Sequence, residues 1–295
     1  MSLFALQGAV ELGLIYALMS LGLFVSYRIL DIPDLTVDSS FTLGAAVAAM
    51  LTVAGHPYLG LGLAVAAGTL GGCLTAFLQT KLQIQPILAG ILSMTALYSI
   101  NLHVMDGKAQ VSMLKTASLY TLSSGKFSKL LVSGAILLAV CLMLGFFFRT
   151  QLGLCIRATG DNEDMVRSSS INTERMKFIG LGLANALVAL SGGMLAQYQN
   201  FADLSMGIGM VVIGLASLII GEVIFGRPNI PRNILAVVLG SIIYRTIIAF
   251  VMARGMSPND LKLISAAIVV LAISYPAILQ KVRVRKLMKE ARLDA

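Results

Sequence analysis

The feature that most constrains this chain is a series of long apolar segments. A helix needs about 20 apolar residues to cross the hydrocarbon core of a bilayer, which is about 30 Å thick. Nine segments approach or exceed this length, at residues 8–30, 35–54, 58–79, 86–105, 130–148, 178–199, 207–225, 230–251 and 261–279. The sequence therefore predicts an all-α, polytopic membrane protein with about eight to ten transmembrane helices, in one transmembrane domain that comprises residues 1–295. The second and seventh segments are rich in glycine and serine, so a re-entrant path is an alternative for both.

Composition also indicates that lipid, rather than water, surrounds the chain. Hydrophobic residues make up 57% of it, charged residues only 12%, and its mean hydropathy is +0.88. Soluble domains contain about 25% charged residues, so this chain has too few to cover a core. The net charge of +8 comes from basic residues scattered at the ends of apolar segments, which favours a membrane surface over nucleic acid as the partner. Cys73, Cys141 and Cys155 are too few for a disulfide framework or a zinc site, and we interpret them as packing residues.

The distribution of lysine and arginine predicts the orientation. With nine spans and a cytoplasmic C-terminus, fifteen of the 22 basic residues fall on the cytoplasmic side and six on the outer side. Cytoplasmic loops carry an excess of basic residues, so we expect the N-terminus outside. The loop at residues 149–177 and the basic tail at residues 281–295 are then cytoplasmic.

The chain also resembles itself when it is shifted by 169 residues. Ala17-Leu18 then aligns with Ala186-Leu187, and the triplet Asp34-Leu35-Thr36 aligns with Asp203-Leu204-Ser205. Each copy contains an apolar helix, a break, the triplet and a glycine-rich segment. An odd number of spans separates the copies, so a true repeat would be inverted in the membrane, as in many transporters. Chance similarity between apolar segments is the alternative.

Ionisable residues within the spans are functional candidates, because each costs about 2.5–3.5 kcal/mol to insert into a bilayer. We interpret Asp34 and Asp203 as helix caps at the interface. Arg245 is expected about 20 Å from the cytoplasmic end of its helix. Its most natural buried partner is Glu222, the one acidic residue in the seventh segment, in a charge pair with a mainly structural role. Snorkelling of Arg245 to the outer surface and a substrate contact are the alternatives.

Catalytic and metal-binding signatures are absent from the sequence. It has no H-E-x-x-H and no G-x-S-x-G motif, and His56 and His103 are isolated. Gly125-Lys126 is followed by Phe127 rather than by a hydroxyl residue, so it is no phosphate-binding loop. We therefore expect no catalytic residue, no metal and no cofactor, and ATP hydrolysis, if needed, on another chain.

The loop at residues 149–177 is the one long polar stretch between spans. Asp161 or Asn162 can cap a short helix that carries Met165 and Val166, and Asn172-Thr173 can cap the next span. A short amphipathic helix of this kind is suited to a groove in a soluble partner. A solvated loop without a partner is the alternative.

This loop resembles the ATPase-coupling loop of ABC importer permeases of the branched-chain amino acid and ribose type. The family pattern is G-x-x-x-R-A-x-G-x-(N or D), and the residues that match it in order are Gly153, Arg157, Ala158, Gly160, Asp161 and Asn162. Residues 13–23 resemble the first helix of that family, and residues 34–37 resemble its D-L-S-V segment. The subgroup predicted to import tryptophan or tyrosine is the most similar, on residues 33–38, 160–162, 190–193 and 201–203.

The resemblance implies a type II importer-like permease in the bacterial plasma membrane. Its expected partners are a second permease copy, in a homodimer or pseudo-dimer, two ATPase subunits that hold ATP and magnesium, and an extracytoplasmic substrate-binding protein. The substrate class implied is a small solute, an amino acid, with an aromatic one favoured. Residues 34–39 replace the Asn-Phe-Ala-His-Gly segment of branched-chain permeases, which argues against leucine, isoleucine or valine.

Two sets of site residues follow from this resemblance. The expected ATPase contacts are Gly153, Arg157, Gly160, Asp161, Asn162, Met165 and Val166. The translocation path is expected at the dimer axis, lined near the two helix breaks by Thr36, Asp38, Ser39, Asn185, Gln197 and Ser205. A stand-alone secondary transporter or channel, with Asp38, Glu222 and Arg245 binding coupling ions, is the alternative function, and an intramembrane enzyme is the weakest.

Overall fold

Long apolar helices form most of the protein in the computed structural model, which describes residues 3–114, 116–121, 128–255, 263–268, 270 and 274. The elements in chain order are α1 (Leu3–Leu23), the π-helix η1 (Phe24–Ile29), α2 (Val37–Val53), α3 (Pro57–Thr80), α4 (Pro86–Val104), β1 (Gln110–Ser112), α5 (Ser128–Phe147), α6 (Gln151–Asp161), α7 (Glu163–Ser168), α8 (Thr173–Gln199), β2 (Phe201–Asp203), α9 (Met210–Phe225) and α10 (Ile230–Ala253). The tail at residues 281–295 and most of the ninth predicted segment lie outside the described residues.

Six helices among the described residues are long and apolar enough to span a membrane, which confirms the prediction of an all-α membrane protein. They are Phe4–Ile29, Pro57–Thr80, Pro86–Val104, Ser128–Phe147, Thr173–Gln199 and Ile230–Ala253. The second and seventh predicted segments form α2 and α9, which have only 17 and 16 residues. At 1.5 Å per residue each is about 25 Å long, which is shorter than the hydrocarbon core.

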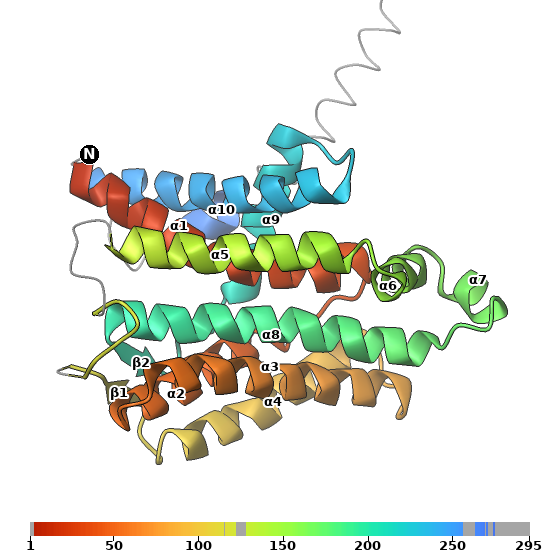
Figure 1. Ribbon diagram of the computed structural model, residues 1–295, viewed down its shortest axis with the longest axis horizontal. Coiled ribbons are helices and arrows are strands. Elements are labelled where there is room, and N and C mark those ends of the chain that lie inside the picture. Colours follow the sequence, from red (N-terminus) through yellow and green to blue (C-terminus); the bar gives the residue numbers. More distant parts are fainter. Residues whose placement is uncertain are drawn as a thin grey trace, which may run out of the picture.

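The long helices lie side by side, and the two strands and the two loop helices lie at opposite ends of the bundle (Figure 1). At one end, β1 pairs with β2 in an antiparallel ribbon with Val111 opposite Ala202. We call this the ribbon end. At the other end lie α6 and α7, formed from the polar loop. We call this the loop end.

The helix α8 lies at the centre of the bundle and packs closely against α2 and α3. A Cβ atom on Gly44 of α2 would lie 2.0 Å from the carbonyl oxygen of Ala189, and one on Gly192 would lie 2.0 Å from that of Phe41. Gly68 of α3 faces α8 in the same way. Glycines at these positions let the helix backbones approach, as expected for helices packed within a membrane.

The two short helices begin at the same place inside the bundle. The Asp38 carboxylate, in the first turn of α2, accepts hydrogen bonds from the backbone N–H groups of Gly209 and Val211 at 2.9 Å each, where α9 starts. From there α2 runs to the ribbon end, where the Thr52 hydroxyl accepts a hydrogen bond from the Gln197 side chain of α8. The helix α9 runs to the loop end, so the two helices diverge in opposite directions, as the inverted repeat predicts.

The aligned triplets adopt the same turn in both copies. The Asp34 carboxylate accepts the Thr36 backbone N–H at 2.9 Å, and the Asp203 carboxylate accepts the Ser205 backbone N–H at 2.7 Å. This turn precedes α2 in one copy and α9 in the other. Neither aspartate is the N-cap residue of a helix, so the interpretation of both as helix caps is wrong: each stabilises a turn instead.

Replacing Gly44 by alanine is expected to destabilise the protein by about 1–3 kcal/mol, because the new methyl group would overlap the Ala189 carbonyl. Gly62 is a matched control in α3, since a Cβ there would meet no atom within 4 Å. Thermal unfolding in detergent should show a lowered midpoint for Gly44→Ala alone. Equal midpoints for the two variants would contradict close packing of α2 on α8.

Candidate functional site

The polar loop folds into two capped helices at the loop end. The Asn162 side chain accepts the Met165 backbone N–H at 3.0 Å and so caps α7. The Asn172 side chain accepts the Arg175 backbone N–H at 3.0 Å and caps α8, as predicted. Of the two candidates for the first cap, Asn162 therefore has this role and Asp161 does not.

The loop divides its predicted contact residues between an exposed and a buried face. Asp161, Asn162 and Met165 are exposed, with Met165 at 68%, and Arg157 is half-buried. Val166 is only 5% exposed. The prediction that Val166 anchors a partner protein therefore conflicts with its position, because it packs within the chain.

Both predicted loop glycines have a packing role. A Cβ atom on Gly160 would lie 2.0 Å from the carbonyl oxygen of Ile29, the last residue of η1. A Cβ on Gly153 would lie 2.3 Å from the carbonyl oxygen of Phe147, at the end of α5. The loop helix α6 is thus packed directly on the ends of two long helices.

An ion-pair network holds α7 on α8. The Glu163 carboxylate contacts the Lys177 amine at 2.7 Å and the Arg167 guanidinium at 3.1 Å. Partial burial acts to raise the pKa of Glu163, but hydrogen bonding and charge from Lys177, with smaller contributions from Thr173 and Arg167, outweigh it and lower this pKa. The lowered pKa keeps Glu163 ionised and the network intact at neutral pH.

A buried polar network joins the segment before α2 to α3 and α8. The Asp34 carboxylate accepts the Asn185 side-chain amide at 2.7 Å, and the Thr36 and Thr75 hydroxyls lie 2.6 Å apart. All four residues are at most 3% exposed. Thr36 and Asn185 therefore join helices together in this chain, and their place on a translocation path stays a prediction.

Two other predicted path residues, Gln197 and Ser205, differ in exposure. The Gln197 amide donates to the Thr52 hydroxyl at 3.1 Å and to the Pro57 carbonyl at 3.0 Å, and its oxygen accepts the Leu119 N–H at 3.0 Å. Gln197 is 1% exposed, so it too has a structural position. Ser205 is exposed at the ribbon end.

Asp38 and Ser39 do line a cavity, of about 240 Å³, between α2, α4 and the segment that leads into α9. Its lining residues are Asp38, Ser39, Thr42, Met94, Thr95, Tyr98, Asn101, Leu204, Gly207 and Ile208. The Asn101 amide nitrogen donates to the Ser39 carbonyl at 3.2 Å, while its oxygen is buried without a hydrogen-bond partner. The cavity therefore has both an acidic and an amide group on its wall.

The contribution of α4 to this cavity was missed from the sequence. Thr95, Tyr98 and Asn101 recur at intervals of three residues within an apolar segment, so they lie on one face of the helix. This regular spacing of polar residues is the feature of the sequence from which the contribution of α4 could have been predicted. It separates α4 from a span that is apolar on every side.

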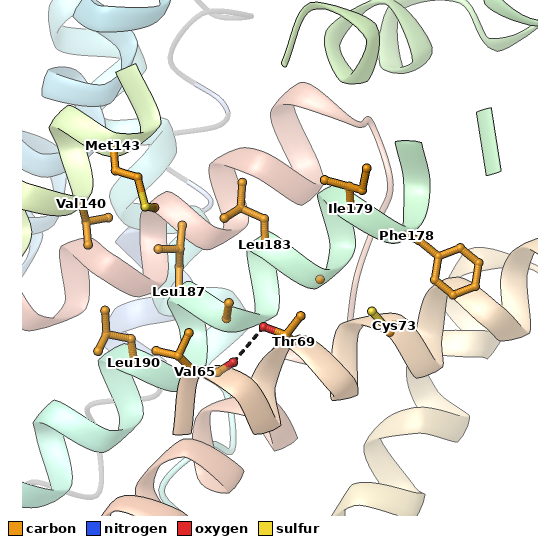
Figure 2. A pocket seen from close by; sticks show the side chains of 12 residues that line it. Val65, Thr69, Cys73, Val140, Met143, Phe178, Ile179, Leu183, Leu187 and Leu190 are labelled. Atoms are coloured by element: carbon orange, nitrogen blue, oxygen red, sulfur yellow. Dashed lines mark hydrogen bonds between the residues drawn. The ribbon is translucent and has the colours of Figure 1, made fainter. Parts of the chain in front are cut away.

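A larger cavity, of about 660 Å³, lies between α3, α5 and α8 (Figure 2). Aliphatic side chains such as Leu183 and Leu187 line most of it, and the Thr69 hydroxyl donates to the Val65 carbonyl of its own helix at 2.8 Å. Cys73 also lies on its wall. The cavity offers no charged group, so it does not suit a polar solute.

The predicted pair of Glu222 and Arg245 does not form. The Glu222 carboxylate instead contacts the Arg28 guanidinium at 3.1 Å and the Arg227 guanidinium at 2.6 Å. The reason is the antiparallel register of α9 and α10: Gly221 lies against Ala236, which is nine residues, or about 14 Å, before Arg245 along α10. The Arg245 guanidinium lies over the ring of Tyr16, 3.6 Å from its centroid.

Comparisons with known proteins agree over nearly the whole chain. Residues 6–274 match the model of a family described as the permease component of the branched-chain amino acid transport system. A tyrosine transport system permease protein of Clostridioides difficile (strain R20291) is 38% identical over 258 residues, which cover 87% of this chain and 86% of the relative. An uncharacterized protein of Rickettsia prowazekii (strain Madrid E) is 34% identical over 273 residues, covering 90% and 95%. The ribose import permease protein of Escherichia coli (strain K12) is 24% identical over 247 residues, covering 81% and 75%.

Removing both basic partners of Glu222, as Arg28→Met with Arg227→Met, is expected to destabilise the protein by about 3 kcal/mol. The Glu222 side chain is 2% exposed and would remain a buried, unpaired charge. Adding Glu222→Leu should restore most of the stability, measured as the thermal midpoint in detergent. A loss of stability in Arg245→Met that Glu222→Leu restores would instead show that Arg245 and Glu222 interact.

Proposed function

This chain belongs to the permease component family of branched-chain amino acid transport systems, and on that basis we propose that it is the membrane subunit of an importer for an aromatic amino acid. It is an ABC-type permease component and a multi-pass membrane protein. The family is non-catalytic, so ATP hydrolysis belongs to separate ATPase subunits.

The observation that carries the substrate class is the similarity to a tyrosine transport permease, at 38% identity over 87% of the chain. The cavity beside α4 agrees with this class. Its exposed wall is mostly apolar and includes the Tyr98 ring and Met94, which suits an aromatic side chain, with Asp38 and Asn101 among the other lining residues. Ser39 and Thr42 leave space there because their side chains are small.

The loop end is proposed to face the cytoplasm and to bind two ATPase subunits. The exposed Asp161, Asn162 and Met165, with the half-buried Arg157, form the contact surface. Gly153, Gly160 and Val166 support this surface from within. The ribbon end then faces the extracytoplasmic binding protein, and two copies of the chain complete the path.

The contacts of α6 provide a route from the ATPase to the interior. Gly160 packs on Ile29, so a displacement of α6 acts on η1. The chain continues from η1 into the segment that contains Asp34, which is bonded to Asn185 of α8. This segment leads into the first turn of α2, where Asp38 holds the start of α9. Movement at the loop end is therefore transmitted to the wall of the 240 Å³ cavity.

The proposal is tested by reconstituting the chain with its ATPase and binding protein in proteoliposomes and measuring tyrosine uptake. Uptake should require ATP, and Met165→Ser should lower both uptake and substrate-stimulated ATP hydrolysis about tenfold, which corresponds to about 1.4 kcal/mol of docking free energy. Met165→Leu is the matched control, because it keeps an apolar side chain of similar volume at the same exposed position and should leave both activities unchanged.

Two outcomes would contradict the proposal. Uptake driven by an ion gradient without the ATPase would favour a secondary transporter. Full coupling in Met165→Ser would remove the assigned docking surface.

A further inference from the structure

Arg245 is a charged residue held at the middle of the membrane. It lies 15 residues after Ile230, the start of α10, and its guanidinium contacts the ring of Tyr16. Tyr16 itself lies 12 residues after Phe4 and 13 before Ile29, so it is about 18–20 Å from either end of that span. Contact with this ring keeps the guanidinium at the middle, where it cannot reach lipid headgroups.

Within the part of the chain that the structure describes, Arg245 has no carboxylate partner. Glu222 is paired with Arg28 and Arg227. Glu11 accepts hydrogen bonds from Gln7 and Tyr198. The Arg245 Nε atom is buried without a hydrogen-bond partner. An arginine stays charged under these conditions, and its insertion costs about 2.5–3.5 kcal/mol, so the position calls for an anion.

Arg245 is half-buried, so part of its side chain stays accessible beside the Tyr16 ring. The ring covers the flat face of the group, whereas the N–H donors point outward in its plane. Tyr16 is 4% exposed and stacks on Phe41 of α2 with ring planes 9° apart, so this support is rigid. Phe41 and Arg245 thus both contact the Tyr16 ring, which links the guanidinium to α2.

We propose that Arg245 binds the carboxylate of the amino acid substrate as it crosses the middle of the membrane. The guanidinium fork matches a carboxylate with two parallel hydrogen bonds, and Tyr16 holds the fork in place. This inference rests on the proposed function and names the group that recognises the charged end of the substrate. It also explains why a charge is placed there without a partner among the described residues.

The test measures protection of a cysteine placed one helical turn from Arg245. Ala249→Cys is introduced into the complex after Cys73, Cys141 and Cys155 are replaced by serine, and its reaction with a water-soluble thiosulfonate is followed in proteoliposomes. Phenylalanine should slow this reaction at least threefold, whereas phenethylamine, which lacks the carboxylate, should not. Arg245→Met should abolish the protection and Arg245→Lys should weaken it.

Arg254→Met is the matched control. Arg254 also lies over an aromatic ring, that of Phe250 at 5.0 Å, but it is exposed at the end of α10. It should leave the protection unchanged. An unreactive Cys at position 249, equal protection by phenethylamine, or protection that persists in both Arg245 variants would overturn the inference. Protection by acetate or phosphate equal to that by phenylalanine would also overturn it, because the site would then bind any anion.

Uptake measured in the same vesicles separates this inference from the proposed function. ATP-driven phenylalanine uptake that is unaffected by Arg245→Met would overturn the inference and leave the proposed function standing. Arginine-dependent protection without ATP-driven uptake would support the carboxylate site and count against the proposed function.

Discussion

The bond between Asp38 and the start of α9 is the interaction on which the arrangement of the interior depends. Two helices begin inside the bundle, and a helix start leaves backbone N–H groups without partners. Inside a bilayer such groups must be satisfied by the protein itself. Asp38 satisfies two of them, at Gly209 and Val211, and its negative charge is favoured at the positive end of the helix dipole. One side chain thereby holds both interrupted helices at a common point.

This joint connects the two ends of the molecule. On the side of the loop end, Gly160 of α6 packs against Ile29. Five residues further along the chain, Asp34 accepts a hydrogen bond from Asn185 of α8. On the other side of the joint lies the cavity walled by α2 and α4. The helices that surround the joint approach through glycines, so they form a rigid frame that resists independent movement of its parts. In the proposed importer, a displacement at α6 is passed through this frame to the cavity.

The sequence predicts the spanning helices well, because the bilayer requires long apolar segments and leaves few alternatives. It also predicts the cap at Asn172 and limits the cap of α7 to Asp161 or Asn162, since a cap needs only its own neighbours. The partner of Glu222 could not be predicted, because it depends on the register of α9 against α10 and on the position of η1. Polar residues within spans are ambiguous for a similar reason: Thr36, Asn185 and Gln197 bond to other helices, whereas Ser39 both bonds to the Met94 carbonyl of α4 and lines a cavity, and only the packing distinguishes them.

The central claim is that nucleotide binding by the ATPase changes the cavity beside Asp38. The most direct measurement is the distance between spin labels at Thr95 and Ile208, two exposed residues on opposite walls of this cavity, with one labelled copy per complex. The account predicts different distances in the nucleotide-free and ATP-trapped complexes, and a reduced difference when Gly160→Ala disturbs the contact with Ile29. The same distance in both nucleotide states would contradict it.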